Sequence, residues 1–144
     1  MKVTEILRNK GADVITIWPG ASLRSAVERM TKRNVGALVV VDDDGKVVGM
    51  LAEREVVRAL ADSAERALNE SVSDVMSRRP VTCGPGDRLA DLMAVMTEHR
   101  VRHLPVVEQG RLLGLVSIGD LVKARLGELE FESNVLRDAY LRVR

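Results

Sequence analysis

The chain has 144 residues, a formal net charge of +1 and an aromatic content of only 2%. This length suits one compact domain with an aliphatic core, and the balanced charge argues against nucleic acid as a partner. A single cysteine, Cys83, excludes an intrachain disulfide, and the sequence shows neither an apolar leader nor a long apolar run. We therefore expect a cytoplasmic protein with no membrane partner.

An internal repeat organises the chain. Four pairs of segments match each other: 3–7 with 72–76, 15–20 with 81–86, 30–41 with 96–107, and 45–49 with 110–114. The two middle pairs lie 66 residues apart and the last pair 65, because the first copy has one extra residue in its acidic turn. We predict a first repeat at 1–65, a second at 66–127 and a C-terminal helix at 128–144, with a polar linker at 61–70.

Within each copy, apolar residues alternate between helical and extended spacing. Helical spacing marks Leu23, Ala26, Val27 and Met30, and in the second copy Leu89, Leu92, Met93 and Met96. Ser22 and Asp87 are placed to cap these helices. Buried strands are predicted at 37–41, 47–51, 104–107 and 112–116, and a first strand in each copy near Ile15 and Cys83. A second helix follows each strand pair, at about 53–60 and 118–126.

These elements predict an α/β fold of two pseudo-symmetric β-α-β-β-α repeats packed sheet to sheet, with a C-terminal helix. One unit is too small to cover both faces of its own sheet, so the two copies should face each other. After Gly127, one helical face collects Leu129, Leu136, Ala139, Tyr140 and Val143. This helix either caps its own domain or binds a partner, and the sequence does not separate the two.

The segment Ser117-Ile118-Gly119-Asp120 lies where a predicted strand passes into a helix. A helix start offers unpaired N–H groups that suit phosphate, Gly119 permits close backbone approach, and Ser117 adds a donor. Asp120 is placed to accept hydrogen bonds from ribose hydroxyls. The same spacing is also typical of a capping box, which only satisfies the helix start.

A basic cluster enters the strand at the same end of the second repeat. Arg100 and Arg102 offer bidentate phosphate contacts, and His103 adds a donor or a pH-sensitive charge. Pro105 lacks an N–H, so we expect the strand to be interrupted or peripheral there, with free carbonyls for a ligand such as an adenine amine. The alternative interpretation is that these residues bind no ligand and form a solvated basic edge.

The doubled pattern resembles the paired CBS domains known as Bateman modules over nearly the whole chain. The resemblance is carried by residues 14–17, 34–40, 100–107 and 114–122. It implies a regulatory, energy-sensing module that binds AMP, ADP, ATP or a related adenosyl ligand such as NAD between the repeats, as a homodimer. It implies no catalysis.

By the same resemblance, the family's hydroxyl and acid fall on Ser117 and Asp120, and its basic phosphate partners on Arg102 and His103. Backbone groups near Lys10, Val14 and Ile15 should approach the ligand from the opposite wall.

The corresponding cleft of the first repeat departs from this pattern. Ala52 replaces the serine, Glu55 replaces the aspartate, and Gly36 and Ala37 replace the two basic residues. We therefore predict that this second cleft, to which Val81 also belongs, is weaker for phosphates, empty, or used for a nucleoside end.

An enzyme would need a nucleophile with a base, or a metal cluster. His99 and His103 are four residues apart, but the chain changes from helix to strand between them, which disfavours a metal site. Cys83 is expected to be a small buried apolar residue. We predict no catalytic cofactor. The remaining alternative is a ligand-free oligomerisation or protein-interaction module with an unknown protein target.

Overall fold

The computed structural model describes residues 1–11 and 13–143, and its elements follow the predicted repeat. The first copy comprises α1 (Val3–Lys10), β1 (Thr16–Ile17), α2 (Leu23–Arg33), β2 (Ala37–Val41), β3 (Val47–Ala52) and α3 (Glu53–Asp62). A short 3-10 turn (Ala67–Asn69) leads to the second copy: α4 (Val72–Val75), β4 (Ser77–Arg78), α5 (Leu89–His99), β5 (His103–Glu108), β6 (Arg111–Ser117) and α6 (Ile118–Val143). The predicted α/β class is confirmed, and α1, α4 and β4 are elements that the predicted β-α-β-β-α unit does not include.

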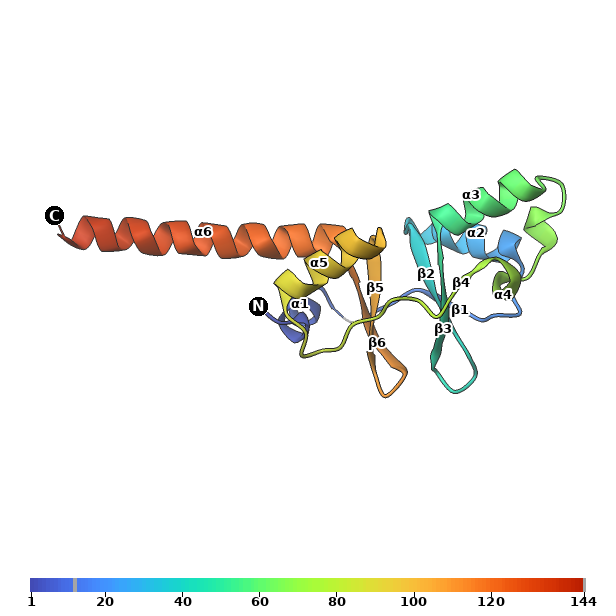
Figure 1. Cartoon of the computed structure of the whole chain (residues 1–144), viewed down its shortest axis with the longest axis horizontal. Helices are drawn as coiled ribbons and strands as arrows, with labels where there is room; N and C mark the ends of the chain where they lie inside the picture. Colours follow the sequence, from blue (N-terminus) through green and yellow to red (C-terminus); the bar gives the residue numbers. More distant parts are fainter. Residues whose placement is uncertain (12, 144) are drawn as a thin grey trace.

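The two sheets lie beside each other at the centre of the molecule, with α2 and α3 beyond one and α1 and α5 beyond the other (Figure 1). The first sheet has the order β1-β2-β3-β4, and the second contains β5 and β6. Ala37, Val39 and Met50 are buried between the sheets against Leu112 and Leu115. This apolar layer is the sheet-to-sheet packing that the repeat predicts.

The helix that opens each copy packs in the core of the other copy. Val3 and Ile6 of α1 are buried in the second core with Leu89, while Val72 of α4 is buried in the first core with Leu23. Backbone hydrogen bonds fix the exchange, from the Val3 N–H to the Asp87 carbonyl at 3.0 Å and from the Val72 N–H to the Ala21 carbonyl at 2.7 Å. Neither copy is therefore a self-contained packing unit.

Two details of the second repeat differ from the sequence prediction. The first strand is reduced to one bridge, between Cys83 and Val106, because Pro80 and Pro85 confine the extended segment. The strand β5 runs through Pro105 without interruption, and the Pro105 carbonyl accepts the Cys83 N–H at 3.0 Å. The predicted interruption at Pro105 is therefore wrong, whereas the alternative of a peripheral strand agrees with the place of β5 in a sheet of only two strands.

The two predicted helix caps have different outcomes. Ser22 caps α2, because its hydroxyl accepts the Ser25 N–H at 3.1 Å. Asp87 does not cap α5, whose N-cap residue is Arg88; its carboxylate instead accepts the Gly84 N–H at 2.8 Å. The tight turn after Cys83 therefore uses the acid that the sequence assigns to the helix.

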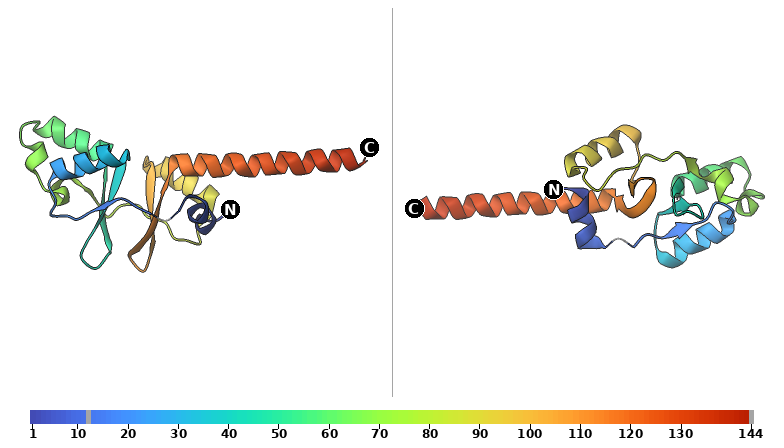
Figure 2. Two further views of the ribbon diagram at one scale, coloured as in Figure 1. Left: turned by 180° about the vertical axis from the view of Figure 1, so that it is seen from behind. Right: turned by 90° about the horizontal axis from the view of Figure 1, so that it is seen from below.

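The C-terminal region is one continuous helix where the sequence predicts two. The helix α6 passes through Gly127 without a break, since the residues on either side are good helix formers that tolerate one interior glycine. It extends away from both repeats (Figures 1 and 2), and every residue from 129 to 142 is exposed. The C-terminal part therefore does not cap its own domain. Within the described residues, no helix has the length and apolar content required to cross a membrane.

Candidate functional site

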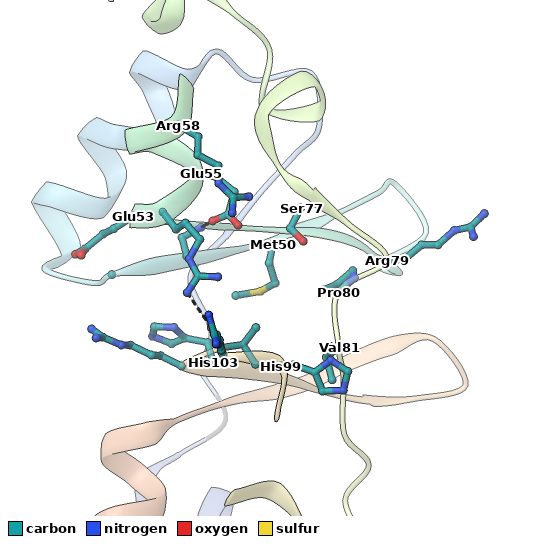
Figure 3. A pocket seen from close by; sticks show the side chains of 16 residues that line it. Met50, Glu53, Glu55, Arg58, Ser77, Arg79, Pro80, Val81, His99 and His103 are labelled. Carbon is teal, nitrogen blue, oxygen red and sulfur yellow. Dashed lines mark hydrogen bonds between the residues drawn. The ribbon is translucent and has the colours of Figure 1, made fainter. Parts of the chain in front are cut away.

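A cavity of about 690 Å³ lies between the two repeats. Figure 3 shows Glu55 and Arg58 on one side of it, Met50 and Ser77 in the middle, and His99 and His103 on the opposite side. The lining residues are Gly36, Met50, Ala52, Glu53, Arg54, Glu55, Arg58, Ser77, Arg79, Pro80, Val81, His99, Arg100, Val101, Arg102 and His103. Five arginines and two histidines face only two glutamates, so the cavity carries excess positive charge.

Each wall comes from a junction between elements. The first turns of α3 supply Glu53, Glu55 and Arg58, because the helix starts directly where β3 ends. On the opposite wall, α5 ends at His99, and Arg100 adopts the left-handed conformation with φ 54° that turns the chain into β5. Such a conformation costs a non-glycine residue about 1–2 kcal/mol.

The two repeats are joined directly at this point. The Arg54 guanidinium donates to the Arg100 carbonyl at 2.9 Å. A side chain of the first copy thereby stabilises the strained turn of the second.

His103 lies at the centre of the charged groups. Burial lowers its pKa, and the nearby Lys10 and Arg102 lower it further, while Asp120 and Glu53 oppose them. A Cβ added at Gly36 would lie 4.0 Å from the His103 ring, so the histidine closely approaches the first repeat. The lowered pKa favours the neutral ring, and an anion beside it would favour the protonated one.

Ser117, Asp120 and Lys10 form a second cluster beside the cavity. Ser117 and Asp120 bond each other reciprocally, since the Ser117 N–H donates to the carboxylate at 2.8 Å and the Asp120 N–H to the hydroxyl at 3.1 Å. The Lys10 ammonium donates to the same carboxylate at 2.6 Å and to the Leu115 carbonyl at 2.8 Å. Burial raises the pKa of Asp120, but the bonds from Lys10 and Ser117 outweigh it and lower that pKa.

The cluster thus has the bonds of a capping box together with one ion pair. Gly119 occupies the first turn beside the Ser117 hydroxyl, which an added Cβ would approach to 3.6 Å.

The structure distributes the predicted site residues differently from the sequence. Arg100, Arg102 and His103 line the cavity together with the residues assigned to the other cleft, Gly36, Glu55 and Val81. Ala37 is buried between the sheets, and Val14 is partly buried against the same cluster. Ile15 packs against the first core. The cleft of the first repeat therefore has cationic residues, because the start of β5 and the residues before it, Arg100 and Arg102, form its opposite wall.

Sequence reasoning missed Arg54, Arg58 and Arg79, which also line the cavity. The available signal was the i, i+4 spacing of Arg54 and Arg58 directly after a buried strand, which places both on one face of the helix start. His99 and His103 share the cavity, but no group of three or more His, Cys, Asp or Glu residues suited to a metal occurs in the described chain.

The family model described as CBS domain matches the chain twice, at residues 3–62 and 72–127. The protein YhcV from Bacillus subtilis is 38% identical over 109 residues, which are 75% of this chain and 76% of YhcV. Arabinose 5-phosphate isomerase KdsD from Yersinia pestis is 27% identical over 124 residues, 86% of this chain but 37% of KdsD. The chain spans between 34% and 65% of the length of several other curated relatives.

Solved structures similar to this chain are also CBS-domain proteins. The CBS-domain protein ATU1752 from Agrobacterium tumefaciens is 43% identical with a TM-score of 0.82, covering 86% of this chain and 92% of ATU1752. CBSX2 in complex with AMP is 25% identical with a TM-score of 0.74, covering 88% and 96%. The MJ0100 domain pair, in complex with 5-methylthioadenosine and S-adenosyl-L-methionine, shares the fold at 24% identity, a TM-score of 0.79 and coverage of 89% and 98%.

Proposed function

Because this chain belongs to the CBS-domain family and carries two copies of the domain, we propose that it is a regulatory module that binds an adenine nucleotide between its repeats. The observation that carries the proposal is the cavity of about 690 Å³, in which arginines from both copies converge. Its volume lies within the range of about 300–1,000 Å³ that is usual for small-molecule sites. CBSX2, a structural neighbour, is known with AMP bound.

The cavity offers a partner for each part of a nucleotide. Arg58 and Arg102 supply charged donors for phosphate oxygens, while the Arg79 side chain points away from the cavity (Figure 3). Glu55 binds the Ala52 N–H through one carboxylate oxygen at 2.9 Å, which leaves the other for ribose hydroxyls. Met50 and Val81 give an apolar surface for the base.

We infer that phosphate binds preferentially in this cavity. The sequence instead predicts that the cleft of Ser117 and Asp120 binds phosphate more strongly than the cleft of the first repeat. In the cluster of Ser117 and Asp120, a ribose would first have to displace the Lys10 ammonium from the carboxylate. That cluster, with Gly119 and the backbone near Val14 and Ile15, is the second and weaker position. The ligand acts as a regulatory effector in this proposal, and the chain has no catalytic role.

The test is isothermal titration of AMP, ADP and ATP, with NAD and S-adenosylmethionine as further ligands. The Arg58→Gln variant removes one cavity charge, and Arg24→Gln removes an exposed arginine of α2 that lies outside the cavity. A charge-assisted hydrogen bond contributes about 1.5–3 kcal/mol, so Arg58→Gln should weaken AMP binding about 10-fold or more. Arg24→Gln should leave it unchanged.

Adenosine serves as the phosphate-free control, and its affinity should be the same for all three proteins. The proposal fails if none of the five ligands binds, or if the two arginine variants behave alike. Asp120→Ala tests the second position, since an unchanged number of bound nucleotides in that variant would exclude it.

We further infer that the module acts as a homodimer and passes ligand occupancy to a protein target. A ligand achieves this only through unequal affinity for two arrangements of the repeats. A second candidate function, a ligand-free interaction module, is favoured by the exposed apolar side chains of α6.

A further inference from the structure

The outer part of α6 exposes apolar side chains that the rest of the fold does not cover. The helix has 26 residues and is therefore about 39 Å long, most of it beyond the repeats (Figures 1 and 2). Large apolar residues on it are well exposed, with Leu126 at 56%, Leu129 at 44% and Leu136 at 70%. A long helix in water is stabilised mainly by packing of an apolar face, so we expect another polypeptide to cover this face.

The exposed residues are spaced as in a coiled coil. One stripe alternates steps of four and three residues along the helix: Val122, Leu126, Leu129, Ser133, Leu136 and Tyr140. This spacing averages 3.5 residues, which keeps a seam in contact with a partner helix of the same kind. In the heptad notation, Val122, Leu129 and Leu136 take the d positions, where leucine is favoured in parallel dimers.

The charges beside the stripe select the orientation of the partner. In a parallel pair in register, a g residue faces the e residue five positions later on the other helix. Arg125 then faces Glu130, and Glu132 faces Arg137, so both of these pairs join opposite charges. The Arg125 guanidinium already contacts Glu128 at 3.4 Å, but its five donors leave room for a second acceptor.

An antiparallel pair with the same overlap is disfavoured by the same residues. It would place Glu130 against Glu130 and Glu132 against Glu132 of the other copy, and Lys123 against Arg137. Each of these contacts joins like charges across the seam, which is destabilising.

We propose that α6 forms a parallel, in-register two-stranded coiled coil with α6 of a second copy of this chain. The inference rests on the homodimer of the proposed function and not on its ligand. Both pairs of repeats then lie at the same end of the coil. Ser133, the polar residue in the stripe, fixes the register at some cost in stability.

The first experiment is cross-linking by disulfide formation in the full chain. Ser133→Cys places a thiol in the seam, and Asn134→Cys places one on the next residue, outside it. The parallel coil predicts that Ser133→Cys gives a covalent dimer under mild oxidation, because the two introduced thiols lie opposite each other. Asn134→Cys should give little, and the wild type, whose single cysteine is buried, none. Equal cross-linking of the two variants, or none in either, would overturn the inference.

The second experiment is sedimentation equilibrium of two double variants with the same charge change. Leu129→Glu with Leu136→Glu puts carboxylates in the seam, while Phe131→Glu with Leu141→Glu puts them on exposed positions outside it. The seam variant should weaken dimerisation about 100-fold or more, because it buries unpaired charges. The other variant should dimerise like the wild type.

The outcomes separate this inference from the proposed function. A wild-type dimer that neither the seam variant nor Ser133→Cys affects would disprove the coiled coil but leave the homodimer. A monomeric wild type would disprove both, and nucleotide titration would be unaffected by either result.

Discussion

The ion pair between Lys10 and Asp120 gives a stability prediction that can be worked from the structure. Asp120→Ala removes the acceptor of the Ser117 N–H and of the Lys10 ammonium. Loss of a helix cap costs about 1 kcal/mol. The ion pair is partly exposed, with side chains 33% and 22% accessible, so it adds about 0.5–1 kcal/mol. The free energy of unfolding should fall by about 1.5–2 kcal/mol, which lowers Tm by about 5–7 °C.

Glu55→Ala is the matched control, because it removes the equivalent cap from the first repeat. Glu55 accepts the Ala52 N–H at 2.9 Å, and no ion pair to it is found among the described residues. Its loss should cost only about 1 kcal/mol. The difference between the two variants measures the ion pair, and 1 M salt should largely remove it.

Urea unfolding followed by circular dichroism supplies the free energies, and Lys10→Met completes a double-mutant cycle with Asp120→Ala. The pKa of Asp120 is lowered in the folded state, so its contribution is complete above the ordinary value of 3.8 and is lost as pH falls through the lower folded pKa. A coupling energy of zero at pH 7 and low salt would refute the ion pair. A loss well above about 3 kcal/mol would show that Asp120 supports more than a cap.

Three further predictions concern packing and titration. Gly114→Ala should destabilise the fold by about 1 kcal/mol in thermal unfolding, because the new Cβ would lie 2.7 Å from a methyl of Leu7 and that side chain must move; the wild-type Tm would contradict a tight contact between Leu7 and β6. The pKa of His103 is lowered, so stability should fall as pH decreases from the ordinary value of 6.5 toward the folded pKa, and His103→Gln should flatten this dependence in a pH series of urea melts. Burial and Asp87 raise the pKa of Cys83 to about 12, so the thiol should react with a chromogenic disulfide only after unfolding in urea; rapid reaction of the native protein would disprove its burial.

The local elements followed from the sequence because their signals are local. The apolar runs at 37–41 and 47–51 predict strands that the structure has as β2 and β3, within one residue. The two errors have different causes. Asp87 bonds Gly84 in a local turn that competes with the helix cap. Pro105 stays within its strand because of a tertiary contact: the bridge to Cys83 uses its carbonyl and needs no N–H from it.

The sequence by itself determined that the chain is a duplicated α/β unit, since segments of matching apolar spacing recur in the same order at nearly equal separations. Only the tertiary structure decided which copy each opening helix joins, because the apolar spacing of α1 does not specify the core against which it packs. It also decided where the cations converge. Arg54 and Arg58 resemble a solvated helix face in the sequence, and they line a cavity only because the other repeat lies opposite them.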